Sequence, residues 1–168
     1  MTALVTDIAV LEKLAERKEE ENWEYCVFFK EGSLSSKRSD AVVHRLHAEV
    51  AEQIDCTTCA NCCKTVLPIL DQEDLDNFAQ GLGISAEELI NKYLTEADTG
   101  MTFKSTPCPF LVDNKCSNYE HRPKDCASYP HLHLPGFLRR TLGVMSNCSI
   151  CPIVFNVIEA LKVELPQS

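Results

Sequence analysis

The chain has 168 residues with ordinary hydrophobic and charged fractions, 45% and 24%, so a globular protein with its own core is expected. Its formal net charge of −9 argues against nucleic-acid binding, which needs a basic face. The sequence shows neither an apolar run near the roughly 20 residues of a membrane span nor the pattern of a signal peptide. We therefore expect a cytoplasmic protein with no nucleic-acid and no membrane partner.

The first third of the chain predicts two amphipathic helices. Residues 6–20 carry one apolar stripe behind Asp7, and residues 43–54 repeat apolar side chains at helical spacing up to Cys56. Between them, the aromatic run 23–29 predicts a strand or a core-anchoring turn, and the Ser-rich segment 31–40 predicts a loop.

Three polar or titratable side chains of this region need an interpretation. Cys26 stands alone in the aromatic run, and we interpret it as a buried thiol rather than a ligand. His44 and His47 are three residues apart on the second helix, which could present two ligands from one face. Because no carboxylate or cysteine completes that set, we interpret them as exposed helix histidines.

Short elements are expected in the middle of the chain. The apolar run 66–70 predicts a strand, and Asp71 begins a helix that passes Phe78 and stops at Gly81. A further helix is predicted to open with a capping box formed by Ser85 and Glu88.

The last third of the chain predicts a hairpin and a closing helix. Asp113-Asn114 marks a tight turn, with Cys108 and Cys116 on the two arms of the hairpin. Pro152 fits the first position of the closing helix, so Cys151 would lie at its amino terminus, where the helix dipole favours a thiolate.

Ten cysteines set this sequence apart, and most of them fall into two arrays. The first array reads CTTCANCC at residues 56–63, and the second follows between residues 108 and 151. In a reducing cytoplasm, clustered thiols more often bind metal than form disulfides. We predict as metal ligands Cys56, Cys59, Cys62, Cys63, Cys108, Cys116, Cys126 and Cys151.

The spacing leaves two cofactors open, an iron–sulfur cluster or Zn2+. A structural zinc site could use the pairs Cys56/Cys59 and Cys148/Cys151. A ferredoxin-type cluster could use the triplet in residues 56–62 with a remote Cys-Pro, either 108–109 or 151–152. Both cofactors accept four thiolates in similar geometry.

Two further features bear on the number of centres and on histidine ligands. Adjacent residues project in different directions, so either two metal centres share the loop that holds Cys62 and Cys63, or one of these two thiols is not a ligand. His121, His131 and His133 lie beside the second array and could replace a cysteine, but each is interpreted as a surface residue or a neighbour of the ligands.

These residues resemble the YkgJ-like cysteine-cluster proteins, a family of zinc- or iron-chelating domains. The resemblance rests on CTTCANCC at 56–63, on PCPFLVDNKCSNYEHRPKDCASYP at 107–130, and on Cys151-Pro152, and it spans roughly residues 50–160. It implies metal chelation through these cysteines. Tyr119 and Arg122 belong to the shared pattern. The Arg would offset thiolate charge or pair with a carboxylate, or the two residues would only hold the turn. A similar cluster accompanies flagellin lysine N-methylases, which keeps an enzymatic role open.

We therefore expect a small α+β domain, mostly helical, in which a short hairpin and loops are organised around a cysteine-ligated metal centre. Residues 1–49 would form a helical extension that packs on a cysteine-cluster domain, residues 50–163. The predicted function is metal binding without catalysis of its own, serving an unidentified protein partner. The alternative is an iron–sulfur redox or methyltransferase-associated enzyme, although no glycine-rich cofactor loop supports an enzyme. Such an enzyme would need an open coordination position or a solvent-accessible thiol, for which Cys148 is a candidate.

Overall fold

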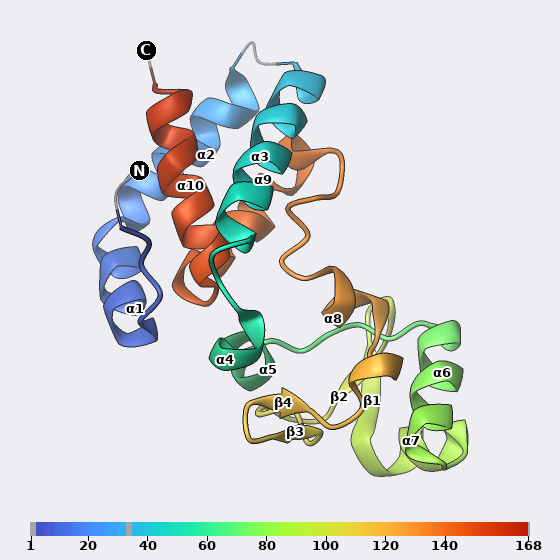
Figure 1. Ribbon diagram of the computed structural model, residues 1–168. Helices are drawn as coiled ribbons and strands as arrows, with labels where there is room; N and C mark the ends of the chain where they lie inside the picture. The colour runs from blue at the N-terminus through green and yellow to red at the C-terminus, as the bar shows by residue number, and fades with distance from the viewer. Residues whose placement is uncertain (1–2, 33–34, 168) are drawn as a thin grey trace. The chain divides into compact units, whose positions relative to one another are not determined.

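The computed structural model describes residues 3–32 and 35–167, which form two compact units (Figure 1). One unit comprises Met1–Asp55 with Pro130–Ser168, and the other comprises Cys56–Tyr129. We call them the helical unit and the cysteine unit. Helices predominate, and the only sheets among the described residues are two antiparallel pairs of short strands. The predicted mostly helical α+β class is confirmed, while the proposed boundary between residues 49 and 50 stays a prediction.

Helices make up the regular structure of the helical unit. They are α1 (Ile8–Arg17), α2 (Glu19–Glu31), α3 (Ser36–Ala51), α9 (Phe137–Ser146), the 3-10 turn η2 (Asn147–Ser149) and α10 (Pro152–Glu164). The helix predicted over residues 6–20 is shorter, because α1 ends at Arg17 and Lys18 separates it from α2. The Asp7 side chain caps α1 by accepting a hydrogen bond from the backbone N–H of Val10 at 2.9 Å. Pro152 is the first residue of α10, as predicted.

Two predictions for this unit are wrong. The aromatic run 23–29 lies inside α2, and the buried residues of this helix, Asn22, Tyr25, Cys26 and Phe29, recur at helical spacing. The loop predicted over 31–40 is largely helical, since α3 starts at Ser36 after the Ser35 hydroxyl accepts from the N–H of Arg38 at 3.3 Å. Residues 33–34 of that predicted loop lie outside the described residues. The prediction that Cys26 is buried is confirmed.

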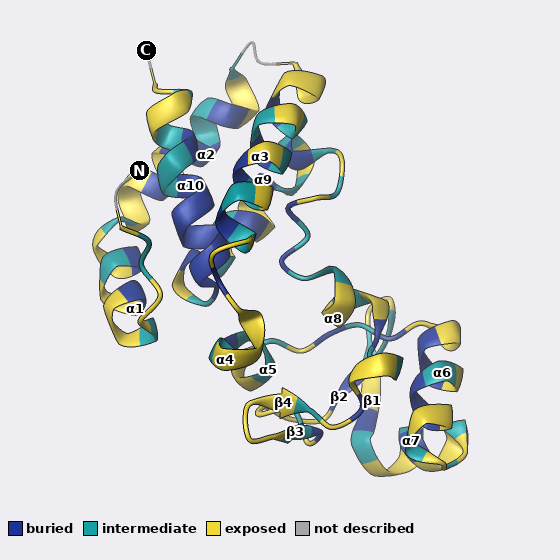
Figure 2. Ribbon diagram, in the orientation of Figure 1, coloured by how far each residue is buried: buried dark blue, intermediate teal, exposed yellow. Residues whose placement is uncertain are grey.

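The core of the helical unit is built around α10, which is apolar on nearly all sides of its amino-terminal half and is coloured there as buried (Figure 2). Polar side chains fix both of its ends. Tyr25 places its hydroxyl 2.9 Å from the carbonyls of Leu161 and Leu165, near the carboxyl end of the helix. The amide of Asn156 pairs with the backbone N–H and carbonyl of Val5 at 3.0 and 2.8 Å.

In the described part of the chain, no single helix is long and apolar enough to cross a membrane. Only a pair of helical segments, Phe137–Ser149 and Pro152–Glu164, has the length and composition of a membrane span, and this pair is bent by 120°.

The cysteine unit combines short helices with two hairpins. Its elements are α4 (Cys56–Cys59), α5 (Asn61–Thr65), α6 (Gln72–Leu82), α7 (Ala86–Tyr93), β1 (Leu94–Ala97), β2 (Gly100–Phe103), β3 (Leu111–Val112), β4 (Lys115–Cys116), the 3-10 turn η1 (Tyr119–His121) and α8 (Lys124–Ser128). The predicted β3–β4 hairpin is confirmed, and its turn residues Asp113 and Asn114 have φ values of 49° and 61°. Two successive positive φ values are typical of the turn that Asp and Asn favour in tight hairpins.

Other predictions for this unit are corrected by the structure. Within residues 66–70, only Leu70 pairs, as an isolated bridge to Met101, because Pro68 has no N–H for a ladder. Helix α6 continues through Gly81 and ends at Gly83, where φ is 69°. The reciprocal capping box belongs to Asp71 and Asp74, whereas Ser85 accepts the N–H of Glu88 at 3.1 Å. The β1–β2 hairpin was not predicted.

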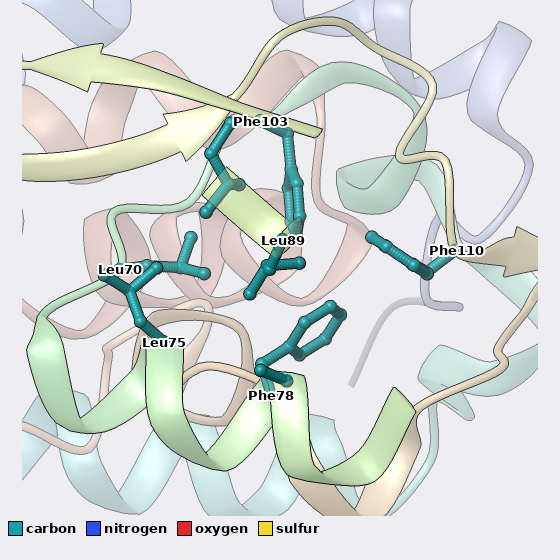
Figure 3. Packing of buried hydrophobic residues seen from close by; sticks show 8 residues of the cluster. Leu70, Leu75, Phe78, Leu89, Phe103 and Phe110 are labelled. Atoms are coloured by element: carbon teal, nitrogen blue, oxygen red, sulfur yellow. The ribbon is translucent and has the colours of Figure 1, made fainter. Parts of the chain in front are cut away.

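An aromatic and aliphatic cluster forms the core of the cysteine unit, and its side chains point toward one another (Figure 3). The ring centroid of Phe78 on α6 lies 5.8 Å from that of Phe103 on β2 and 4.9 Å from that of Phe110. Phe110 stands between Cys108 and the β3–β4 hairpin, so its burial fixes the start of the hairpin against α6.

Replacing Tyr25 by Phe tests the polar anchor of α10. Tyr25→Phe leaves the apolar contacts and removes the hydroxyl that the carbonyls of Leu161 and Leu165 accept from, so we expect a loss of about 1 kcal/mol in the free energy of unfolding, measured by urea denaturation. Trp23→Phe on the same helix is the control, because Trp23 is 59% exposed and its replacement should change stability by less than about 0.5 kcal/mol. Equal effects of the two substitutions would contradict the prediction.

Candidate metal centre

The first array occupies two very short helices joined by a left-handed residue. Cys56 and Cys59 lie in α4, Cys62 and Cys63 lie in α5, and Ala60 between them has a φ of 51°. The N–H of Ala60 donates to the carbonyl of Cys56 at 3.1 Å, which closes α4 before the chain changes direction. The CTTCANCC segment is therefore a sharp turn that presents its thiols from two helices rather than one.

A backbone hydrogen bond joins the two arrays. The N–H of Cys108 donates to the carbonyl of Cys63 at 2.8 Å. Cys116 lies on β4 opposite Leu111, so the hairpin brings it back toward the same end of the unit as Cys108. Residues that are 45 positions apart in the sequence, Cys63 and Cys108, are thus in direct contact through their backbones.

Two cysteines of the second array receive hydrogen bonds at sulfur from the backbone. The N–H of Phe110 donates to Cys108, and the N–H of Asn118 donates to Cys116, each from a position two residues further along the chain. Hydrogen bonds from N–H groups stabilise the thiolate, which is the form that binds metal. This repeated local geometry prepares both sulfurs for ligation.

The four thiols of Cys63, Cys108, Cys116 and Cys126 interact electrostatically. A hydrogen bond from Cys62 lowers the pKa of Cys63 to about 7, and Lys64 contributes to the decrease. Burial of the thiol, followed by the charge of Cys63, raises the pKa of Cys126 to about 12. Burial is also the main cause of the raised pKa values of Cys108 and Cys116, to which Cys63 adds. The structure therefore brings together one thiol of the first array and three of the second.

Helix α6 holds the second array in position. The side chain of Asn118 donates to the carbonyl of Phe78 at 2.9 Å, and the ring of His121 pairs with Asn77 at 3.0 Å. Asp74 accepts from the N–H of Lys124 at 2.9 Å. The residues that flank Cys116 and Cys126 are thereby attached to one face of a single helix.

Gly81 allows the segment 118–121 to approach α6 closely. A Cβ at position 81 would lie 2.2 Å from the side-chain oxygen of Asn118 and 2.6 Å from the ring of His121. Sequence reasoning assigned Gly81 to the end of a helix, whereas it lies inside α6 where the 118–121 segment packs. A glycine within a helical pattern is the sequence signal for such a contact.

Arg122 contacts both the second array and its own turn. Its positive charge opposes the increase in the pKa of Cys116, of which burial is the main cause. Its guanidinium lies 3.8 Å from the ring centroid of Tyr119 and donates to the Tyr119 carbonyl at 2.8 Å. With Lys64 beside Cys63, the thiols have two cationic neighbours.

A family model described as "CxxCxxCC: Putative zinc- or iron-chelating domain" matches residues 55–152. The chain belongs to this family. The matched region of the CxxCxxCC domain includes both cysteine arrays and continues to Pro152, so the family resemblance seen in the sequence is confirmed and the chain carries a metal-binding domain of the zinc- or iron-chelating type. Searches of curated proteins and of solved structures found no match.

Two cysteines of the CxxCxxCC match lie in the helical unit. Cys151 is the residue before α10, as predicted, and it is buried. Cys148 lies in η2 and is only 2% exposed, and burial raises its pKa to about 12. The interpretation of Cys148 as a solvent-accessible thiol, on which the enzymatic alternative drew, is therefore wrong.

The histidines near the arrays have other contacts. His121 pairs with Asn77 in the cysteine unit. His44 and His47 on α3 are half-buried, so the interpretation of exposed helix histidines is wrong. Their contacts are with the segment that precedes α9: His44 lies 3.1 Å from the carbonyl of Leu134, and the ring of His47 stacks on that of His133.

In residues 3–32 and 35–167, no three Cys, His, Asp or Glu side chains are arranged so that they could hold a metal ion as they stand. The fit of the CxxCxxCC domain to a metal rests on the chemistry of its donors. Four thiols interact, two of them accept backbone N–H bonds, and two cations offset their charge. Sulfur donors of this kind suit zinc and iron.

Replacing Gly81 by Ala tests the packing of the second array on α6. Because Asn118 and His121 are both anchored by hydrogen bonds, they cannot yield easily to the added methyl group, and we expect a loss of about 1–3 kcal/mol in unfolding free energy. Gly143→Ala is the matched control, since a Cβ at this position in α9 meets nothing within 4 Å and should stabilise the helix by up to about 1 kcal/mol. Thermal denaturation compares the two, and a neutral Gly81→Ala would contradict the proposed packing.

Replacing Cys62 by Ala tests the hydrogen bond that activates Cys63. Without that donor, the pKa of Cys63 should rise from about 7 toward the ordinary thiol value, roughly 8.5, so alkylation of Cys63 at pH 7 should slow by about ten-fold. Iodoacetamide labelling of the reduced, metal-free protein followed by tandem mass spectrometry measures the rate at this residue. Cys62→Ser keeps a hydroxyl donor and should stay near the original rate, and equal slowing in both variants would count against the hydrogen bond.

Proposed function

We propose that this protein is a non-catalytic metal-binding protein that holds zinc or an iron–sulfur cluster, with Cys63, Cys108, Cys116 and Cys126 as the core of its ligand set. The observation that carries the proposal is the electrostatic interaction of the Cys63 thiol with the three thiols of the second array. Thiols from distant parts of the sequence are close enough to influence each other's ionisation. A shared cation is the simplest chemical reason for such a grouping.

The electrostatics explain why a cation would bind there. Each thiolate raises the pKa of its neighbours, so the group resists full ionisation when no metal is bound. A metal ion reverses this effect, because it favours the deprotonated form of every sulfur that it contacts. Binding should release protons, and metal affinity should increase as the pH rises toward and above neutrality.

The remaining predicted ligands stay in the proposal as a pool for further ligation. Cys56 is exposed and Cys59 and Cys62 are half-buried, so metal ions can reach this loop from solvent. With Cys151, these residues bring the proposed ligands to eight, enough for two four-coordinate ions or for one cluster with spare thiols. An unidentified protein partner would receive or supply the metal.

Two further parts of the proposal follow from the ligand chemistry. A metal closed by four protein thiolates has no open position for a substrate, which supports binding without catalysis. No disulfide joins any two cysteines among the described residues, and thiols kept in this form fit a reducing compartment, so we propose a cytoplasmic location.

Metal analysis of protein purified without oxygen tests the proposal and separates the two cofactors. Stoichiometric zinc in colourless protein would identify a zinc chelator, and iron with acid-labile sulfide and broad visible absorbance would identify a cluster. Protein that binds neither, even after anaerobic reconstitution, would overturn the proposal.

The ligand set is tested with Cys116→Ser. Removing a residue that hydrogen-bonds to a metal ligand typically weakens metal affinity by about 10–100-fold. Removing a ligand sulfur itself should weaken the affinity by more than that. Cys26→Ser is the matched control, because Cys26 is a buried thiol of α2 in the helical unit. Competition with a chromophoric chelator measures both affinities, and unchanged affinity in Cys116→Ser would remove this residue from the set.

A further inference from the structure

The short connection between α9 and α10 carries two cysteines with two residues between them. The 3-10 turn η2 holds Cys148, and Cys151 directly precedes α10. The N–H groups of Ile150 and Cys151 both donate to the carbonyl of Asn147, at 3.0 and 2.9 Å. These two hydrogen bonds close a single tight turn, and Cys148 and Cys151 lie on it three residues apart.

The geometry of this turn suits a disulfide. Side chains three residues apart in a 3-10 turn lie over one another. The Cα atoms across a turn of this kind are less than about 7 Å apart, and a disulfide joins Cα atoms that are about 4.4–6.8 Å apart. The turn therefore holds Cys148 and Cys151 at a backbone separation that a disulfide can span.

The surroundings give the two thiols different reactivity. Cys151 stands at the amino end of a helix of 13 residues, where the helix dipole favours a thiolate. Cys148 is 2% exposed, and burial, to which the charge of Cys151 adds, raises its pKa to about 12. In exchange with a disulfide, the thiol with more thiolate character attacks first. Cys151 is thus suited to attack, and Cys148 to complete the reaction.

A small reagent can approach this turn from solvent. Ser149, which lies between the two cysteines, is exposed, and Cys151 is itself 7% exposed. The hydrogen-bond geometry of a 3-10 turn is poorer than that of an α-helix, so such a turn opens more easily. Cys151 is therefore the thiol that the reagent reaches first.

We propose that Cys148 and Cys151 form a redox-active dithiol, which a low-molecular-weight disulfide such as oxidised glutathione converts to an intramolecular disulfide. The thiolate of Cys151 attacks one sulfur of the small disulfide, releases one small thiolate and becomes part of a mixed disulfide. Cys148 then gives its proton to water and attacks the sulfur of Cys151, which releases the second small thiolate. The two released thiolates take up protons. Two protein thiols are oxidised while one small disulfide is reduced to two thiols, so excess reduced thiol reverses the reaction.

This dithiol goes beyond the proposed metal binding and does not depend on it. Both of its cysteines belong to the helical unit, whereas the four thiols proposed as the core of the ligand set belong to the cysteine unit. Formation of the disulfide would withdraw Cys151 from the pool of further ligands and leave those four thiols unchanged.

Peptide mapping of the full chain after incubation with oxidised glutathione tests the dithiol. Remaining thiols are alkylated with iodoacetamide under denaturing conditions, and trypsin then releases residues 141–162, whose only cysteines are Cys148 and Cys151. We expect this peptide to lose both alkylations and to be lighter than the dithiol peptide by two hydrogen atoms. Excess reduced glutathione should restore both thiols. The chain is tested as purified without oxygen and again after its metal is removed by a chelator, so that ligation of Cys151 cannot conceal the reaction.

Cys26 is a matched control within the same protein. It is as buried as Cys148, 1% against 2% exposed, but no other cysteine lies within three residues of it. Its tryptic peptide, residues 19–30, should remain alkylated under the same conditions. An equal loss of alkylation at Cys26 would show that oxidation does not depend on the turn, and it would overturn the proposal.

Two serine variants test the roles of the two thiols. Cys148→Ser lacks the second thiol, so the mixed disulfide with glutathione should accumulate at Cys151. Cys151→Ser should form at least about ten-fold less adduct, since one pKa unit changes the thiolate fraction ten-fold, and equal adduct in the two variants would contradict the assignment of the attacking thiol. If a variant does not fold, the peptide of the unaltered chain decides. The dithiol is overturned if both cysteines stay alkylated in each metal state, or if either forms a disulfide with another peptide instead.

Discussion

The hydrogen bond from the N–H of Cys108 to the carbonyl of Cys63 is the contact on which the candidate site depends. It fixes the second array against the first at the level of the backbone, before any sulfur is considered. The thiols can then influence one another, and the N–H groups of Phe110 and Asn118 can donate to sulfur from within the hairpin. Side-chain chemistry is thus the consequence of a backbone arrangement, as expected for a site in which several ligands must be held together.

That arrangement is supported from outside the site by α6. This helix buries Phe78 against Phe103 and Phe110, and its polar face binds Asn118, His121 and the backbone of Lys124. One helix therefore connects the apolar core to the residues around Cys116 and Cys126. Because Gly81 has no side chain, Asn118 and His121 can lie close to the backbone of α6.

Sequence reasoning succeeded where local chemistry decides the structure and failed where packing does. Pro152 acts through its ring geometry and Asp113-Asn114 through turn propensity, and each has the predicted role. The run 23–29 was assigned wrongly because clustered aromatic residues fit strands and helices alike, and only the burial of one face of α2 distinguishes them.

The same limit explains what the sequence could show of the site. Spacing identified the thiols, but neighbouring cysteines in CTTCANCC look equivalent, and only the fold associates Cys63 with the second array. His47 and His133 are far apart in the chain and belong to no motif, so the sequence could not predict that their rings stack.

The two units are built on different apolar cores. Helix α10 buries eight of its thirteen residues in the helical unit, whereas the cysteine unit has a compact cluster beneath short helices and two-stranded hairpins. Small units with limited cores are commonly stabilised by a bound metal, whose binding free energy becomes folding free energy. The grouping of thiols in the cysteine unit, beside its small core, is therefore as much a structural feature as a functional one. Metal binding would therefore add to the stability that this cluster supplies to the cysteine unit.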